Sequence, residues 1–545
     1  MPCSWWRAGP RRTLAVLALS AVAASGCGAA GATPTVPPVS SPTPGPTAPD
    51  TTPRGGSMTI GLAADLATWD PGEVSSTAPA GPGDPLDAVY GALVYTDIHG
   101  VVQPGMAKSL TTADAIAWTL KLRDGVKFTD GTDYTAAAVK YNWDRIADPA
   151  QDEPSQEFAA SFGTAVVDRT TLAITLPAKD ADFAAEVAER IAWIASPTAL
   201  NAAQKHSDVK PVGAGPFRLV SWNPGVQETL VRNDAYWDRP RPYLDGLRFV
   251  TAADPAARQA AVVAGQAQIS DGYLYQFGTA ATAPGVTTRD TSVEGLNIAW
   301  LNTATGIMSD VRARQAVVAG VNRDRWILAQ TVDPSVKAPP SLYPASWALS
   351  DASLSLPRFD AARAQSLIDA LATAGRKFTL TIVAPHTPEA ERGANWLQQT
   401  LTAFRGVAAT VRLVPPATWQ DACQKQSSYD ICIAPETITF DGPEPSTHDL
   451  LASGGPLNLS RYSSGAMDAD LAAAAGATTG ADRIAAYRGI QQQFLDDLPF
   501  VPYGLQHRYL LLRLDVGGVV NAGQGQVQPQ FLYYCPGTCP GEPAR

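Results

Sequence analysis

The sequence is poor in residues that several common functions require. It has five histidines, and its 41 lysines and arginines are outnumbered by 51 acids, which gives a net charge of −10. We find no cluster of basic residues that could neutralise phosphates, so we expect no nucleic-acid partner. The histidines include no pair at ligand spacing, and we predict neither a metal site nor a cofactor. They are His99, His206, His386, His448 and His507.

Long apolar runs are missing after the N-terminus, and a membrane-spanning helix needs about 20 such residues. The N-terminus has three arginines, an apolar run from Leu14 to Ala24 and then small residues up to Cys27. This is the pattern of a secretory signal over residues 1–26. The four residues ending at Cys27 resemble the bacterial lipobox, whose cysteine receives a lipid, although Ala24 stands where leucine is usual. An ordinary cleaved signal or a short anchor is the alternative.

Residues 27–56 consist mostly of proline, threonine, serine, glycine and alanine. Such a segment cannot bury a core, so we expect an extended, lipidated tether. A lipid, a tether and a folded body together predict an exported protein held at the outer face of the cytoplasmic membrane.

Four cysteines follow the tether, at Cys423, Cys432, Cys535 and Cys539. An even number in an exported chain favours disulfides, and pairing each cysteine with its nearest neighbour is the most local of three possibilities. A zinc site at the CPGTC stretch is the rival interpretation.

A chain of 545 residues with 45% hydrophobic residues is long enough for two or three domains. Its most regular part runs from Asp360, which can cap a helix, to Ala434. The order strand, helix, strand, helix, strand predicts a parallel α/β unit there. Ligands bind beyond the carboxyl ends of such strands. The stretch FDGPEPSTHDLL at 440–451 begins just past the last of them.

Several other stretches follow one another in a recognisable order. WTLKLRDGVKFTDGTDYTAAAVKYNWDRI reads as a strand, two Asp-Gly turns and a helix, and it is accompanied by PVGAGPFRLVSWNPG, RNDAYWDRPRPYLDGLRFV, DVRARQAVVAGVNRDRWI and FDAARAQSLIDAL. Together they resemble the family-5 extracytoplasmic solute-binding proteins of peptide and nickel ABC importers, over roughly residues 57–515. The resemblance implies an α/β fold of the periplasmic-binding-protein type, a two-lobed clamp with mixed sheets, an extra inserted domain and a hinge.

Carried onto this chain, the resemblance gives domain boundaries. It places lobe one at 57–90, 197–297 and 500–545, the inserted domain at 91–196, and lobe two at 298–499.

In peptide-binding members of that family, lobe two carries an aspartate that pairs with the α-ammonium group of the peptide. The matching segment here is DGPEP, so the resemblance implies that Asp441 binds the ammonium group and that Glu444 is the second acid. Gly442 replaces the usual tyrosine, which removes one wall of the site. Trp300 and Asn302 fall on the strand that enters lobe two beside the cleft, and we expect them to contact the ligand.

Other functions for these residues are less well supported. Asp441 could instead cap a helix that starts at Ser446. The two acids show no arrangement for glycoside hydrolysis, and we find neither a phosphate loop nor a Gly-x-Ser-x-Gly nucleophile motif. We therefore predict a monomeric lipoprotein that is not an enzyme. It would capture short peptides for the permease and ATPase subunits of an ABC importer.

Two alternatives stay open. One is a non-transport lipoprotein of the same fold that acts as a regulatory or interaction partner in the cell envelope. The other is an importer component for haem, a nickel chelate or a sugar.

Overall fold

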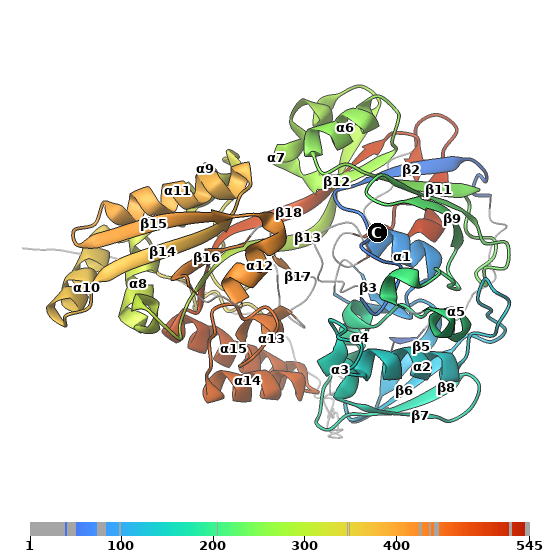
Figure 1. Cartoon of the computed structure of the whole chain (residues 1–545), viewed down its shortest axis with the longest axis horizontal. Helices are drawn as coiled ribbons and strands as arrows, with labels where there is room; N and C mark the ends of the chain where they lie inside the picture. Colours follow the sequence, from blue (N-terminus) through green and yellow to red (C-terminus); the bar gives the residue numbers. More distant parts are fainter. Residues whose placement is uncertain are drawn as a thin grey trace, which may run out of the picture.

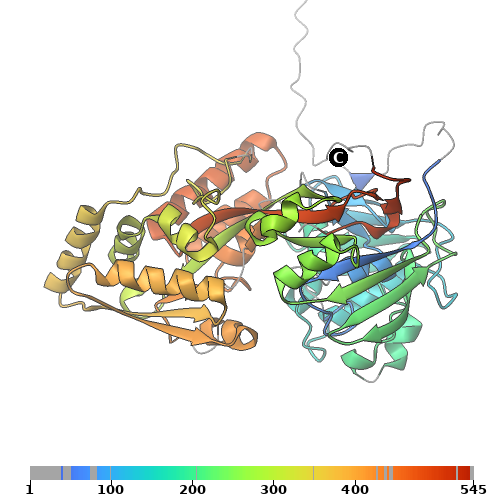
Figure 2. The ribbon, with the colours of Figure 1, turned by 90° about the horizontal axis from the view of Figure 1, so that it is seen from above.

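The computed structural model has two bodies joined by two long strands (Figure 1). These are β13 (Val286–Leu301) and β18 (Phe500–Arg513), which pair antiparallel along most of their length. Figure 2 shows the same two bodies and the joining strands from above. The expected two-lobed α/β fold is confirmed. The structure describes residues 39–40, 51–73, 83–97, 100–203, 205–345, 347, 349–424, 428–434, 438–440, 446–522 and 526–539.

One mixed sheet of eleven strands runs through both lobes within this described part of the chain. β13 and β18 are its middle strands. On the lobe-two side of β13 lie β16 (Ile431–Ile433), β14 (Phe378–Pro385) and β15 (Val407–Val414), and β17 (Ile438–Phe440) also pairs with β13. On the lobe-one side of β18 follow β12 (Ile269–Tyr273), β2 (Ser57–Leu62), β11 (Gly246–Thr251), β10 (Gln227–Arg232) and β9 (Phe217–Asn223).

Lobe two contains the stretch where the sequence pattern is most regular, and the prediction for that stretch is confirmed. Asp360 caps the first helix by accepting a hydrogen bond from the Arg363 N–H. β14 then pairs parallel with both β15 and β16, as an α/β unit requires. The helices of this lobe are α8 (Val311–Gly320), α9 (Arg323–Thr331), α10 (Ala361–Thr373), α11 (Pro388–Thr402), α12 (Pro416–Gln424), α13 (Ser446–Leu451), α14 (Gly465–Ala475) and α15 (Gly480–Asp497).

The other body combines the lobe-one strands with a smaller antiparallel sheet. That sheet has the order β1 (Val39–Ser40), β5 (Ala107–Thr112), β6 (Ala117–Leu122), β8 (Thr171–Thr175) and β7 (Gly163–Val166). The two predicted Asp-Gly turns after β6 are present, and Gly125 and Gly131 have φ of 71° and 86°, which glycine adopts without strain. Two further pairs are β3 (Val94–Thr96) with β4 (Val102–Pro104) and β19 (Val516–Gly517) with β20 (Tyr533–Tyr534).

The helices of this body lie on both sides of its sheets. Thr135 caps the longest of them, as its side chain accepts from the Ala138 N–H, and Trp143 and Ile146 on its buried face enter the core. They are α1 (Gly83–Val89), α2 (Ala136–Ala147), α3 (Gln156–Ala160), α4 (Phe183–Arg190), α5 (Pro197–Ala202), α6 (Pro255–Val263) and α7 (Leu274–Phe277).

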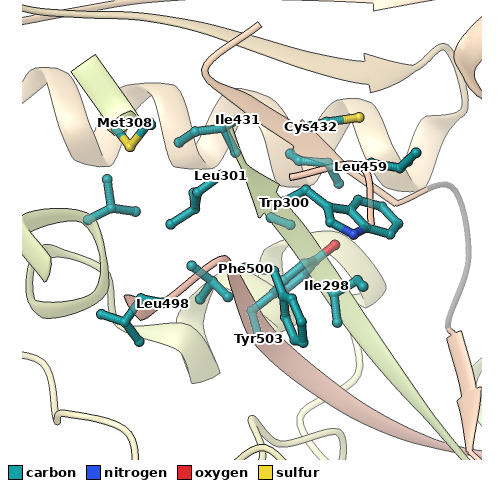
Figure 3. Close-up of a cluster of buried hydrophobic side chains, with 14 of the residues drawn as sticks. Ile298, Trp300, Leu301, Met308, Ile431, Cys432, Leu459, Leu498, Phe500 and Tyr503 are labelled. Carbon is teal, nitrogen blue, oxygen red and sulfur yellow. The ribbon is translucent and has the colours of Figure 1, made fainter. Parts of the chain in front are cut away.

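The buried apolar side chains of the described residues form three large clusters and one small one. Residues between 296 and 503 form the largest, and residues between 93 and 236 form the second. The third combines three chain segments, at 58–90, 193–269 and 510–532. Figure 3 shows the part of the largest cluster in which Trp300 and Phe500, from the two joining strands, pack near Ile431 and Cys432 of β16. From these clusters we propose that the lobes and the inserted domain have the boundaries implied by the resemblance.

The two disulfides follow the most local pairing. Cys423 of α12 is bonded to Cys432 of β16, and Cys535 is bonded to Cys539. The CPGTC cysteines therefore have no thiolate to offer a zinc ion. No helix in the described ranges combines the length and the apolar character needed to cross a bilayer. Cys27 and the signal lie outside the described residues, so export and lipidation stay predictions.

Candidate functional site at the junction of the lobes

The site is built on β13, which belongs to both lobes. Its first part, from Val286 to Asp290, pairs with the end of β18, and its second part, from Glu294 to Trp300, pairs with the beginning of β18. The register shifts between Asp290 and Glu294, and again between Asn297 and Ile298. Two irregularities in one antiparallel ladder interrupt its regular alternation of hydrogen-bonded pairs, and such irregularities bend a strand locally. The junction therefore lies at these positions.

The predicted ammonium-binding segment is flanked in the chain by β17 and α13. Asp441 and Glu444 themselves lie outside the described residues. β17, which ends at Phe440, pairs with β13 so that Phe440 lies opposite Glu294, beside the first register shift. The chain is described again from Ser446, where α13 begins. β17, which precedes the segment, therefore lies beside the strand that passes between the lobes.

α13 is fixed from two directions. Its Thr447, 1% exposed, lies 3.1 Å from the Tyr343 hydroxyl within lobe two. Its Asp449, also 1% exposed, accepts a hydrogen bond of 2.5 Å from Arg190, the last residue of α4 in the inserted domain. The helix that follows the predicted ligand segment is therefore in contact with the opposite body.

Trp300 and Asn302 are covered by the protein in this structure. Trp300 is 1% exposed, and its ring lies 5.8 Å from that of Trp419. Its buried indole N–H has no hydrogen-bond partner among the described residues. Asn302 is fully buried and donates to the Tyr429 carbonyl oxygen at 2.9 Å. A ligand contact by either residue stays a prediction.

A cluster of charges between lobe one and the inserted domain escaped the sequence analysis. Arg145 of α2 lies 2.5 Å from Asp70 and 2.9 Å from Glu153, and both carboxylates have no exposed surface. His206 Nδ1 lies 2.8 Å from Asp70 Oδ2, and His206 Nε2 lies 3.3 Å from Glu73. The cluster ties the segment after β2 to the inserted domain.

This cluster contains a possible set of metal ligands. Asp70, Glu153 and His206 could each offer one ligand atom, and the three atoms lie within 4.8 Å of one another. However, the Arg145 guanidinium already contacts both carboxylates, and a divalent cation placed among them would be repelled by it. We interpret the group as an ion-pair network.

Burial and neighbouring charges change two pKa values in the network. Burial raises the pKa of Glu153 to about 7, with the nearby Asp70 acting in the same direction and Arg145 opposing it. Burial alone would lower the pKa of His206, but the hydrogen bond to Asp70 and the charges of Glu73 and Glu153 outweigh it and raise that pKa. Both groups therefore hold a proton more tightly than they would in water.

Comparisons with known proteins agree with this architecture. Residues 101–457 match the family described as "Bacterial extracellular solute-binding proteins, family 5 Middle". The glutathione-binding protein GsiB of Escherichia coli (strain K12) is 31% identical to this chain over 224 residues. That match covers 41% of this chain and 43% of the relative, which is less than half the length of either.

Two solved structures illustrate the likeness in fold. The periplasmic binding protein DppA from Helicobacter pylori, in complex with peptide STSA, matches with a TM-score of 0.76 and 22% identity, over 88% of this chain and 98% of that one. NikA from Brucella suis, in complex with Fe(III)-EDTA, matches with a TM-score of 0.74 and 20% identity, over 88% and 100%. Because the family match extends over more than half of the chain, this protein belongs to the bacterial extracellular solute-binding proteins, family 5.

Proposed function

We propose that this protein is the extracytoplasmic binding subunit of an ABC importer and that it captures short peptides between its two lobes. The observation that supports the proposal is the position of the elements on either side of the segment with Asp441. β17, which precedes it, pairs with β13, where the chain passes between the lobes, and α13, which follows it, contacts the inserted domain through Asp449. A ligand held there would contact both lobes, which is how a clamp couples binding to closure.

Asp441 supplies the chemistry of recognition in this proposal. A carboxylate enclosed with an ammonium group makes a charge-assisted hydrogen bond, which is stronger than a neutral one. The same carboxylate alone in a closed site would be desolvated without a partner, so an uncharged ligand end is disfavoured. Glu444, Trp300 and Asn302 are the further proposed contacts, and the indole N–H of Trp300, which has no partner among the described residues, supports a role as a donor.

Peptides are the ligand class that the comparisons favour. GsiB is named for glutathione, and the DppA structure contains the peptide STSA; both ligands carry a free ammonium group. A metal chelate is the second candidate, because the NikA structure contains Fe(III)-EDTA. The Asp441 carboxylate would distinguish the two classes, because it would attract the ammonium group of a peptide and repel a negatively charged chelate.

The proposal includes no chemical step. The protein would remain attached to the outer face of the cytoplasmic membrane by a lipid on Cys27 and the tether at 27–56, and would deliver its ligand as a monomer to permease and ATPase subunits. Mass spectrometry of the purified, diacylated N-terminus would test the anchor.

Calorimetry with a set of short peptides tests the binding proposal. We expect wild-type protein to bind, Asp441→Ala to lose about 10- to 100-fold in affinity, and N-acetylated peptides to bind wild-type protein as poorly as free peptides bind the variant. Asp369→Asn, a surface carboxylate of lobe two paired with Arg405, is the matched control and should bind normally. Equal affinity for acetylated and free peptides would refute the ammonium contact, and uptake of Fe(III)-EDTA instead of any peptide would favour the chelate class.

A further inference from the structure

Helix α4 of the inserted domain makes a second connection between the two bodies, apart from the joining strands. α4 belongs to the inserted domain because Phe183 and Val187 lie in its apolar cluster. In Figure 1, α4 lies on the side of the inserted domain that faces α13 and α14 of lobe two. Each end of α4 carries an ion pair to lobe two.

At the N-terminal end, the capping residue Asp182 binds Arg483 in the first turn of α15. The two guanidinium nitrogens lie 2.8 Å and 2.9 Å from the two carboxylate oxygens, which is a bidentate pair. Next to it, the Ala181 N–H donates to the Ala475 carbonyl oxygen at the end of α14, at 2.7 Å. Three hydrogen bonds therefore connect the start of α4 to lobe two.

At the C-terminal end, Arg190 binds Asp449 of α13 at 2.5 Å, and the two side chains are 13% and 2% exposed. Burial alone would lower the pKa of Arg190, but the Asp449 carboxylate raises it above the ordinary value. This pair is therefore largely desolvated, and Glu186 and Glu189 of α4 also act on Arg190. Removing Arg190 would leave Asp449 buried without this partner as long as the lobes stay together.

Contacts of this kind suit a connection that opens and closes. A continuous apolar interface between domains resists separation, whereas charged groups regain their hydration when the surfaces part. The α4 contacts would all break if the lobes rotated apart about β13 and β18, because no covalent link or shared strand joins α4 to lobe two in the described residues. These contacts can therefore form only when the two lobes are together.

We propose that the pairs Asp182–Arg483 and Arg190–Asp449 form a latch that holds the two lobes closed without ligand. If the proposed function is correct, the latch also positions the ligand segment, since Asp449 lies on the helix that follows it directly. The latch sets the population of the closed state, and through it the rate at which a bound ligand leaves.

Small-angle X-ray scattering of the purified, ligand-free protein tests the latch independently of any ligand. We expect Arg190→Gln/Arg483→Gln to increase the radius of gyration by about 1 Å or more, as hinge opening does. The matched control is Arg312→Gln/Arg405→Gln, which removes two ion pairs of 2.7 Å and 2.6 Å within lobe two, and it should leave the radius unchanged. A wild-type protein as expanded as the latch variant, or an equal change in both variants, overturns the proposal.

If the double variant does not fold, exchanging the charges of Asp182 and Arg483 gives a second test of the latch. Asp182→Arg should expand the protein by repulsion, and adding Arg483→Asp should restore the compact radius; failure to restore it in a folded protein also overturns the latch. In a separate measurement, peptide dissociation from Arg190→Gln/Arg483→Gln should be about tenfold faster. If no peptide binds even the wild type, the proposed function fails while the scattering result still decides the latch.

Discussion

Two buried ion pairs in this protein have nearly the same local geometry but connect different parts. Arg145–Asp70 and Arg190–Asp449 both have a nitrogen to oxygen distance of 2.5 Å, with side-chain exposures of 16% and 0% in the first and 13% and 2% in the second. The first lies inside one body, and the second bridges two bodies that can rotate apart. The same interaction should therefore stabilise the fold at one position and set a conformational equilibrium at the other.

The largest effect is expected for Asp70→Ala. The change leaves Arg145, which is 16% exposed, with one carboxylate fewer, and no separation of the two bodies can hydrate it further. We expect the free energy of unfolding to fall by about 3 kcal/mol, measured by urea denaturation. Phe359→Ala, at an apolar side chain that is 51% exposed, should change it by under ~0.5 kcal/mol. If Asp70→Ala lost as little stability as Phe359→Ala, the Arg145–Asp70 pair would not stabilise the fold.

The second effect is a pH dependence from Glu153 and His206, which both contact the first pair. Glu153 and His206 both have raised pKa values, to about 7 for Glu153, so the folded protein binds protons more tightly than the unfolded chain. The stability they provide is complete below the ordinary pKa values and is lost as pH rises through the raised ones. Between pH 5 and 8 we expect it to fall by about 2 kcal/mol more in wild type than in Glu153→Gln/His206→Gln. Urea denaturation at several pH values measures this, and an Arg405→Gln protein, which loses an exposed pair in lobe two, should keep the wild-type slope.

A smaller loss of stability is expected for Asp449→Ala, although its pair is as short as that of Asp70. Arg190 can regain water when the lobes separate, so the cost is limited by the free energy of opening. We expect the free energy of unfolding to fall by about 1 kcal/mol or less, together with an increased radius of gyration. If Asp449→Ala lost as much stability as Asp70→Ala, with no change in the radius of gyration, both pairs would stabilise the fold and neither would control lobe opening.

The smallest effect is expected for Arg405→Gln. Its pair with Asp369 is mostly exposed, at 77% and 45%, and both partners are hydrated whether or not they meet. Exposed pairs of this kind contribute about 0–1 kcal/mol, so we expect a change within ~0.5 kcal/mol at low salt and less at high salt. A larger loss would mean that exposure does not determine how much each of the three pairs contributes to stability.

Part of this structure could be predicted from local sequence patterns. The unit from Asp360 to Ala434 was predicted because a capping side chain, helix spacing and strand spacing all act within a few residues of one another. The two-lobed arrangement was predicted from ordered motifs that resemble a family. Periodicity alone could not supply it, because β13 and β18 are far apart in the chain and pair only after folding.

The charged contacts could not be predicted from the sequence, because their partners are also far apart in the chain and meet only after folding. Asp182 and Arg483 are 301 residues apart, and Arg190 and Asp449 are 259 apart; nothing near either residue distinguishes it from a solvated surface charge. His206 was likewise counted among scattered histidines, although folding brings Asp70 and Glu153 next to it. The role of Asp441 rests on the family motif and on its flanking elements, and it stays a prediction.

The late position of β18 affects the order in which the chain can fold. Lobe two is nearly continuous in sequence, so its core can form as soon as its residues have been synthesised. In lobe one, β12 pairs with β18 through Ile269–Tyr273 and Leu512–Arg508, which means that residues 274–507 must be made after β12 before this partner exists. Until then β12 is an unpaired sheet edge, the kind of surface at which wrong chains add on. Truncation before residue 500 would therefore do more than remove a tail, because it would leave that edge open permanently.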